Sequence, residues 1–221
     1  MLSARAKAAW AAAGEERWLL EDDYDSEFRY EGMTIPSLKS LDHHDRVITL
    51  GNFSKSISPA LRISYMVLPE ALAGRLEASP AASDEAKEAL LDACPVNAAA
   101  QLALAAFLKK GLYEKHVKRL RTAFRNKRDL MLDCLGPDVD KGDIIGAEAG
   151  FHLNVRIHSP ASEKELKRRF AAAGLRIEFL SDYQVSQKQA KEQDEKILIL
   201  SFSSLSPEQI REGVEKIFAL L

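Results

Sequence analysis

The sequence is poor in features that mark several large protein classes. Only two of its 221 residues are cysteines. Cys94 and Cys134 lie far apart, without a CxxC spacing or a nearby histidine cluster, so neither a disulfide framework nor a zinc site is predicted. No apolar run reaches the roughly 18 to 20 residues that a membrane-spanning helix needs. We therefore expect a cytoplasmic protein with reduced thiols and no membrane segment.

An excess of charge of either sign is also lacking. The 31 basic and 33 acidic residues give a formal net charge of -2, so no chain-wide attraction to nucleic acid or anionic lipid is expected. Hydrophobic residues make up 46% of the chain and charged residues 29%, which is ordinary for one or two compact domains. This composition excludes the disordered, collagen-like and coiled-coil classes.

Three apolar runs in the first half predict buried strands of one sheet. They cover residues 18–20, 47–50 and 63–68, and the first two lead directly into polar segments. Open α/β sheets bind ligands outside the carboxyl ends of their strands. We therefore expect a ligand site along this edge of the sheet.

From residue 70 to residue 135 the pattern is helical only, and it ends in a long helix that could bridge two lobes. The expected buried stripe of this helix consists of Leu112, His116, Leu120, Phe124, Met131 and Leu135. Basic residues crowd its other positions, namely Lys115, Lys118, Arg119, Arg121, Arg125, Lys127 and Arg128. A solvated helix face with acidic partners is the favoured interpretation of these charges, and nucleic-acid binding is the alternative.

Beyond residue 136 strands and helices alternate, which predicts a second, smaller lobe. Its strands are expected at residues 151–157, 175–179 and 197–202. Ser162 with Glu165, and Ser206 with Gln209, have the spacing of capping boxes that begin two helices.

Three short segments carry groups that together suit a pyridoxal 5′-phosphate site. The string EDDYDSEFRY, residues 21–30, supplies carboxylates at one strand end, Ser54-Lys55 supplies an amine beside a hydroxyl, and Arg62 supplies a guanidinium. This cofactor needs a lysine for a Schiff base, a carboxylate that keeps the ring nitrogen protonated, and serine and arginine for its phosphate.

The strings EDDYDSEFRY and GNFSKSISPALRISYMVLP resemble the pyridoxal-phosphate domain of MocR-type regulators, in which a GntR-type winged helix is fused to an aminotransferase-like module. Related class I/II aminotransferases share the pattern. The resemblance covers essentially the whole chain and implies an α/β, fold type I fragment. It assigns residues 1–110 to the second half of a large domain with a parallel sheet, 111–135 to a bridging helix and 136–221 to an α+β small domain.

The resemblance also implies a role for each matching side chain. Lys55 would be the catalytic lysine that binds the cofactor covalently, and Asp22 would hold the ring nitrogen. Tyr24 would hydrogen-bond the phenolic oxygen of the ring, while Ser54 and Arg62 would hold the phosphate.

The sequence departs from the family in several places. Nothing matches the upstream half with its winged helix, glycine-rich phosphate turn and ring-stacking aromatic, so we expect a fragment or a start that lies too far downstream. Asn52 replaces a common threonine, and Ser64 replaces a common glycine. Ile199 stands where aminotransferases of this fold often have an arginine for the α-carboxylate, which favours a regulator-type ligand site or an altered substrate.

Three functions stay open at this point. The first is the effector-sensing part of a MocR/GntR-type regulator, which binds an amino acid or amine. The second is a truncated aminotransferase, and the third is a non-catalytic remnant. A homodimer or a complementing N-terminal half is the expected partner, with no direct nucleic-acid contact from this segment and no membrane.

Two simpler interpretations concern individual residues. The acidic string could be only a solvated turn. The pair His43-His44 with Asp45 could bind a metal, but adjacent side chains diverge and no further ligand is suitably spaced. We expect no metal.

Overall fold

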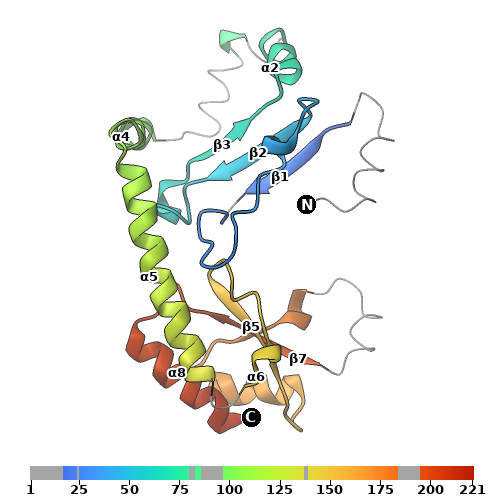
Figure 1. Ribbon diagram of the computed structural model, residues 1–221, viewed down its shortest axis with the longest axis vertical. Helices are drawn as coiled ribbons and strands as arrows, with labels where there is room; N and C mark the ends of the chain where they lie inside the picture. The colour runs from blue at the N-terminus through green and yellow to red at the C-terminus, as the bar shows by residue number, and fades with distance from the viewer. Residues whose placement is uncertain (1–16, 24, 80–82, 86–96, 137–138, 184–194) are drawn as a thin grey trace. The chain divides into compact units, whose positions relative to one another are not determined.

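The computed structural model describes residues 17–23, 25–79, 83–85, 97–136, 139–183 and 195–221 (Figure 1). The chain divides into two compact units. Unit 1 comprises Met1–Asp25 and Thr34–Tyr113, and unit 2 comprises Ser26–Met33 and Glu114–Leu221. The chain thus enters unit 2 briefly before it returns to unit 1. The three-region division expected from the sequence stays a prediction.

Unit 1 contains a mixed sheet in the order β1-β2-β3 (Figure 1). β1 (Leu19–Asp23) runs parallel to β2 (Val47–Asn52), and β3 (Ser64–Val67) runs antiparallel to β2. One sheet was expected, but the expectation that its third strand is buried is wrong. All four residues of β3 are exposed, because among the described strands it lies at the end of the sheet and pairs with β2 alone.

The helical segments of unit 1 are short. Among the described residues they include the 3-10 turns η1 (Lys39–Leu41) and η2 (Pro59–Leu61) and the helices α2 (Glu70–Glu77) and α4 (Ala98–Lys109). The Asn97 side chain caps α4 by accepting a hydrogen bond from the amide of Ala100 at 3.1 Å.

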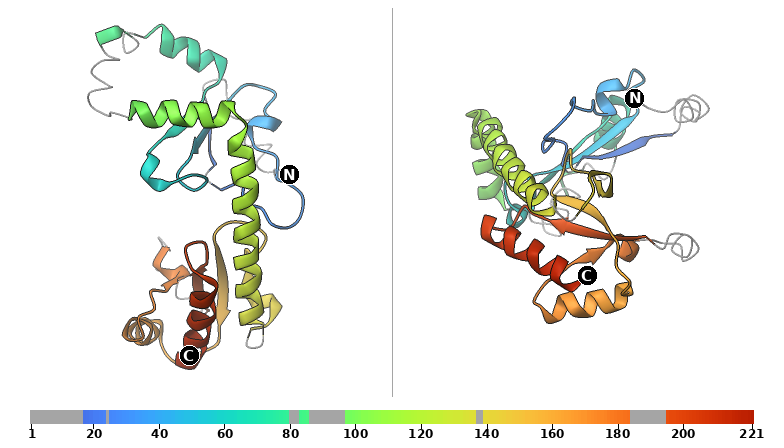
Figure 2. Two further views of the ribbon diagram at one scale, coloured as in Figure 1. Left: turned by 90° about the vertical axis from the view of Figure 1, so that its left-hand side faces the viewer. Right: turned by 60° about the horizontal axis from the view of Figure 1, so that its bottom comes forward.

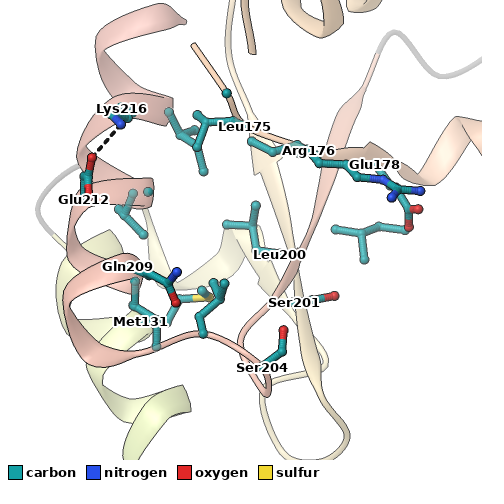
Figure 3. A pocket seen from close by; sticks show the side chains of 18 residues that line it. Met131, Leu175, Arg176, Glu178, Leu200, Ser201, Ser204, Gln209, Glu212 and Lys216 are labelled. Atoms are coloured by element: carbon teal, nitrogen blue, oxygen red, sulfur yellow. Dashed lines mark hydrogen bonds and ion pairs between the residues drawn. The ribbon is translucent and has the colours of Figure 1, made fainter. Parts of the chain in front are cut away.

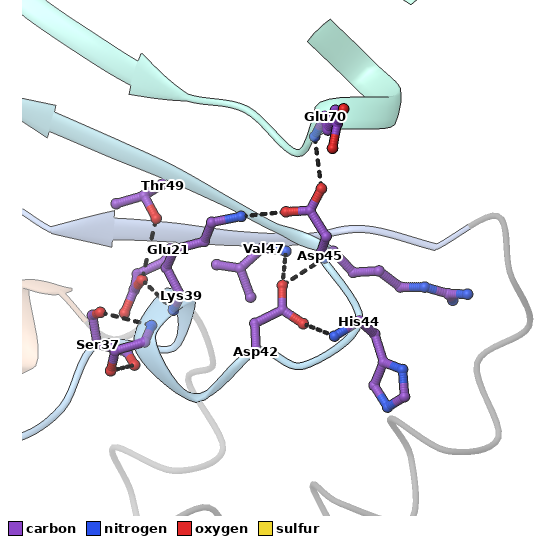
Figure 4. A network of polar contacts seen from close by, with 11 residues as sticks. Glu21, Ser37, Lys39, Asp42, His44, Asp45, Val47, Thr49 and Glu70 are labelled. Atoms are coloured by element: carbon purple, nitrogen blue, oxygen red, sulfur yellow. Dashed lines mark hydrogen bonds and ion pairs between the residues drawn. The ribbon is translucent and has the colours of Figure 1, made fainter. Parts of the chain in front are cut away.

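Three carboxylates fasten the loop that joins β1 to β2 (Figure 4). Glu21 of β1 accepts the backbone amides of Leu38 and Lys39 at 2.5 and 3.2 Å. Asp45 binds the Lys39 ammonium at 2.6 Å and accepts the amide of Glu70 at 2.6 Å. Asp42 accepts the amides of His44, Arg46 and Val47 at 2.9, 2.5 and 2.8 Å. The loop therefore takes its shape from local polar contacts.

Unit 2 contains a four-stranded antiparallel sheet in the order β4-β5-β7-β6. Its strands are β4 (Ile144–Ile145), β5 (His152–Ile157), β6 (Glu178–Phe179) and β7 (Lys196–Ser201). The expected strands at 151–157 and 197–202 are confirmed to within one residue. The expected strand at 175–179 is wrong in length, because only its last two residues pair with β7.

In the part of unit 2 that the structure describes, the α-helices are α5 (Leu112–Leu135), α6 (Glu163–Ala172) and α8 (Pro207–Leu220) (Figure 2). Ser206 and Gln209 form the expected reciprocal capping box at the start of α8. At α6 only half of the expected box forms. Ser162 accepts the amide of Glu165, but the Glu165 carboxylate binds arginines instead.

Unit 2 has a continuous apolar core. Phe28, Leu153, Leu166, Phe179 and Leu198 are all fully buried in it. Cys134 is a free, half-buried thiol, and Cys94 lies outside the described residues. In the part of the chain that the structure describes, no helix combines the length and the apolar character needed to cross a membrane.

Candidate functional site

The strand register of unit 1 brings the predicted site segments to one edge of the sheet. Asp22, near the end of β1, pairs with Leu50 of β2. Asn52, the last residue of β2, pairs with Ser64, the first residue of β3. Neighbouring strands lie about 4.8 Å apart. The ends of β1 and β2 and the start of β3 therefore meet at this edge.

The segment that carries Ser54 and Lys55 turns tightly after β2. The amide of Phe53 donates to the Ile63 carbonyl at 3.2 Å, which closes the loop between β2 and β3. The Phe53 carbonyl accepts the amide of Ile57 at 2.9 Å. Ser54 and Lys55 thus stand at the beginning of a loop whose two ends are hydrogen-bonded together.

Asn52 contributes directly to the shape of this turn. Its side-chain oxygen accepts the amide of Ser54 at 3.0 Å, which forms an Asx turn. A threonine hydroxyl can make the same kind of local bond, although more weakly. The replacement of threonine by asparagine is therefore compatible with the turn that presents Ser54.

Aromatic side chains of unit 1 support the loop between β2 and β3. The buried Ser56 hydroxyl accepts a hydrogen bond from the Tyr113 hydroxyl at 3.0 Å. The Phe53 ring lies 5.5 Å from the Tyr65 ring and 5.8 Å from the Tyr113 ring. Sequence reasoning missed these supporting residues, because a serine in a polar run and a tyrosine 57 residues away give no signal of mutual contact.

Gly51 is a further residue that sequence reasoning missed. A Cβ atom placed on Gly51 would lie 2.2 Å from Cζ of Tyr65, so the Tyr65 ring rests against the Gly51 backbone. Any larger residue at this position would displace the Tyr65 ring. A glycine inside a strand pattern is the signal that could have predicted such a close approach.

Arg62 has an unusual backbone conformation. Its φ of 52° and ψ of 36° lie in the left-handed region, which costs a residue other than glycine about 1–2 kcal/mol. Such outliers persist where the surrounding structure fixes them, and they are concentrated at ligand sites. The loop therefore fixes the backbone of the predicted phosphate ligand in a strained conformation immediately before β3.

The predicted site residues differ in exposure. Asp22, Lys55 and Arg62 are exposed, and Ser54 is half-buried. Tyr24 lies outside the described residues. A carboxylate, an amine, a hydroxyl and a guanidinium are thus carried by segments that converge on one sheet edge. This donor set fits pyridoxal phosphate, which needs one partner for each of its charged groups.

The second half of the acidic-aromatic string has a structural role in unit 2. The Phe28 side chain is fully buried, and the Tyr30 hydroxyl donates to the Gly150 carbonyl at 2.7 Å. Arg121 and Arg125 of α5 donate to the backbone carbonyls of Glu27 and Tyr30 at 2.6 and 3.1 Å. The string is therefore more than a solvated turn.

The expectation that the basic residues of α5 form a solvated face is wrong for Arg128. Its side chain is only 5% exposed and binds Glu31 at 2.6 Å and Asp129 at 2.5 Å. It also donates to the Ala147 carbonyl at 2.9 Å and lies 5.3 Å from the Tyr30 ring centroid. Glu31, Tyr30 and Ala147 lie far from Arg128 in the sequence, so helical periodicity could not identify these contacts.

Two other predictions from the sequence concern a metal site and the residue at the position that binds a substrate carboxylate. No cluster of three or more potential metal ligands occurs among the described residues. Ile199 lies in β7, between Asn154 of β5 and Glu178 of β6.

Comparison with known proteins agrees with this architecture. The chain is 37% identical over 211 residues to YdeL, an HTH-type transcriptional regulator of Bacillus subtilis, and is 29% identical over 203 residues to MocR, a probable rhizopine catabolism regulatory protein of Rhizobium meliloti. The chain is a homologue of MocR-type regulators. The alignments cover 95% and 91% of this chain but only 42% and 38% of those proteins. No protein-family model matches.

The fold of this MocR homologue is that of fold type I aminotransferases. The α-aminoadipate aminotransferase LysN of Thermus thermophilus has a TM-score of 0.73 and 26% sequence identity. The match covers 99% of this chain and 53% of LysN. That structure contains N-(5'-phosphopyridoxyl)-L-leucine. The chain therefore spans about half of its structural relative and less than half of the two regulators.

Proposed function

We propose that unit 1 binds pyridoxal 5′-phosphate at the sheet edge that carries Asp22, Lys55 and Arg62, and that the chain senses an amine effector within a MocR-type regulator. The register that unites the ends of β1 and β2 with the start of β3 carries this proposal. The regulators YdeL and MocR and the phosphopyridoxyl ligand of LysN support it. A cytoplasmic location goes with this proposal.

Each side chain has a distinct task in this proposal. Pyridoxal phosphate, when bound, supplies an electron-accepting ring. Lys55 provides the amine that attaches the cofactor, and Asp22 keeps a proton on the ring nitrogen. Ser54 donates a hydroxyl hydrogen bond to the phosphate, which the Arg62 guanidinium binds in a bidentate manner. Tyr24 would donate to the phenolic oxygen.

The second candidate function is amino-group transfer, because Lys55 and Asp22 are the groups that transamination requires. Ile199 favours sensing over turnover, since an isoleucine cannot bind a substrate carboxylate. A ligand that contains an amine could still displace Lys55. We propose an amino acid or amine as this ligand, and a homodimer or a complementing N-terminal half as the partner that covers the exposed strand β3.

An absorbance titration tests the proposal. Wild-type protein titrated with pyridoxal phosphate should develop a saturable band of lysine-bound cofactor, and Lys55→Ala should abolish it. Lys109→Ala is the matched control, because Lys109 is also an exposed lysine of unit 1. A folded wild-type chain without a band, or a Lys55→Ala variant that keeps it, would overturn the proposal.

A second measurement separates sensing from catalysis. The cofactor-loaded chain is incubated with amino acids and 2-oxoglutarate, and glutamate is measured. A spectral change without multiple turnover supports sensing, whereas sustained formation of glutamate supports the aminotransferase alternative.

A further inference from the structure

Unit 2 contains a pocket of about 520 Å³, and all of the residues that line it belong to unit 2 (Figure 3). Its floor is apolar and includes Met131, Leu200, Leu205 and Ile210. This volume is within the range of roughly 300–1,000 Å³ that is typical of small-molecule sites, and an apolar floor is typical as well.

The pocket forms where the pairing between β6 and β7 ends before the end of β7. β7 continues to Ser201, but its pairing with β6 ends where Ile199 meets Glu178. The preceding segment, residues 175–177, forms no ladder with Leu200 and Ser201 in the described chain. Leu175 and Ile177 line the resulting wedge together with β7 and α8.

Gly213 keeps the α8 side of this wedge open. It lies inside the helix, where glycine is less favourable than alanine. A Cβ atom added to Gly213 would meet nothing within 4 Å, so no crowding within unit 2 requires glycine there. Gly213 itself lines the pocket. Gly213 therefore leaves open space on the α8 side of the pocket.

Polar groups are placed around the apolar floor (Figure 3). The Gln209 side-chain oxygen accepts the amide of Ser206 at 2.8 Å, which leaves its NH2 group for another partner. Charged side chains occur on two sides of the pocket. Lys216 and Glu212 form an ion pair of 2.6 Å on α8, and Arg176 and Glu178 lie on the segment that leads into β6. Two cations and two carboxylates give the lining no net charge.

From these features we infer that the pocket is a second ligand site, which binds a zwitterionic amino acid with an apolar side chain. The apolar side chain occupies the floor near Met131 and Leu200. The α-ammonium and α-carboxylate face the two carboxylates and two cations of the lining, of which Glu212 and Lys216 form an ion pair and Glu178 accepts the Tyr183 hydroxyl. A ligand with one charge of each sign matches these charges best. None of the lining residues belongs to the cofactor edge, although the lining includes Ile199, the position discussed above for a substrate carboxylate. A Lys55→Ala background therefore separates this inference from the cofactor proposal.

Isothermal titration calorimetry with L-leucine tests this inference on the Lys55→Ala chain without pyridoxal phosphate. In that background any binding is independent of a covalent bond to the cofactor. Isocaproate, which lacks the ammonium, and isopentylamine, which lacks the carboxylate, have the same apolar tail. We expect L-leucine to bind at least about tenfold more tightly than either.

Variants then locate the site. Gly213→Phe fills the pocket and should abolish L-leucine binding. Ala219→Phe is its matched control, because it adds the same ring to an exposed position of α8 outside the pocket, and should bind normally. Arg176→Gln should weaken binding at least about tenfold, whereas Arg211→Gln, an exposed arginine outside the pocket, should not.

Several results would overturn the inference. These are no binding of L-leucine to the folded Lys55→Ala chain, equal binding of isocaproate or isopentylamine, and normal binding by a folded Gly213→Phe variant. If circular dichroism shows that Gly213→Phe does not fold, Arg176→Gln replaces it, and normal L-leucine binding by folded Arg176→Gln would overturn the inference. Binding that appears only with Lys55 and pyridoxal phosphate would also contradict the inference, while supporting the cofactor proposal.

Discussion

The two units differ in how their apolar side chains are used. Unit 2 buries a continuous cluster of aromatic and aliphatic residues, including Phe28, Phe170 and Phe202. Among the described residues of unit 1, Val47 and Leu104 are the buried large hydrophobics, whereas many others are exposed. The proposed cofactor edge therefore belongs to the unit with the smaller core.

The two units are therefore stabilised in different ways. Unit 2 can hold its fold by burial, since each fully buried large apolar side chain contributes about 1.5–3 kcal/mol. Unit 1 depends more on strand pairing and on local polar contacts such as those of Glu21, Asp42 and Asp45 (Figure 4). Its exposed strand β3 is a surface that another chain or segment could cover.

The strongest test of this contrast is a truncation in each unit. Phe28→Ala removes a fully buried ring that contacts Phe124 and Phe151, so unit 2 should lose about 3–5 kcal/mol of unfolding free energy. Met66→Ala in exposed β3 should change stability by less than about 0.5 kcal/mol. Urea unfolding measures both losses of stability. Circular dichroism follows the whole chain, and tryptophan fluorescence follows unit 1, because both tryptophans of the sequence belong to that unit. Equal losses would remove the contrast.

Replacement of a buried charge should have the next largest effect. Arg128→Gln leaves the Ala147 carbonyl and the Glu31 carboxylate without their guanidinium, which should cost unit 2 about 1–3 kcal/mol. Arg168→Gln breaks an exposed pair with Glu165 and should cost less than about 1 kcal/mol. Urea unfolding compares the two variants. A larger loss for Arg168→Gln would contradict the buried role of Arg128.

Helix caps should affect both units similarly, because a cap is a local contact. Ser206→Ala in unit 2 and Asn97→Ala in unit 1 each remove an oxygen that accepts a backbone amide, so each should cost about 1 kcal/mol. Urea unfolding followed by circular dichroism measures the loss for Ser206→Ala, and urea unfolding followed by tryptophan fluorescence measures the loss for Asn97→Ala. A negligible effect for Asn97→Ala would show that α4 contributes little to unit 1.

The smallest predicted effect is an acid transition in the loop of unit 1. Burial acts to raise the pKa of Asp42, but hydrogen bonds from the amides of His44, Val47 and Arg46 lower it more, so its pKa falls below the ordinary value of 3.8. A carboxylate with a lowered pKa stabilises the fold above its ordinary pKa, and this contribution is lost as the pH falls through the folded value.

NMR detects this transition through the amide shifts of His44 and Val47 during acid titration. The midpoint should lie below pH 3.8 in the wild type, and Asp42→Asn should remove the transition. Glu165 gives a comparison in unit 2, where hydrogen bonds from Arg168 and then Arg169 lower the pKa to about 2. A midpoint at or above pH 3.8 for the Asp42 contacts would show that the amide bonds do not hold in solution.

Local patterns predicted much of the fold. The helical periodicity gave both ends of α5, and the Ser206 capping box gave the start of α8, because both signals depend on residues within a few positions. The direction of β3 was missed, because an apolar run has the same appearance in parallel and antiparallel strands. Arg128 was placed on the wrong face, because its partners are distant in sequence.

The candidate site shows the same division. The residue types at positions 22, 54, 55 and 62 predict a cofactor site, since each group suits one part of the cofactor, and this assignment stays a prediction. The left-handed backbone of Arg62 and the contact between Gly51 and Tyr65 could not be predicted, because they result from the closure of the β2–β3 loop. The pocket of unit 2 arises where β6 ends early, and no sequence pattern marks that point.

Chemical trapping identifies the lysine that binds the cofactor. The chain is saturated with pyridoxal phosphate, reduced with borohydride and digested, and the modified peptides are identified by mass spectrometry. We expect a single dominant phosphopyridoxyl label on Lys55, which is lost in Lys55→Ala and weakened by Arg62→Gln. A label spread over exposed lysines such as Lys109, or concentrated on a lysine of unit 2, would contradict it.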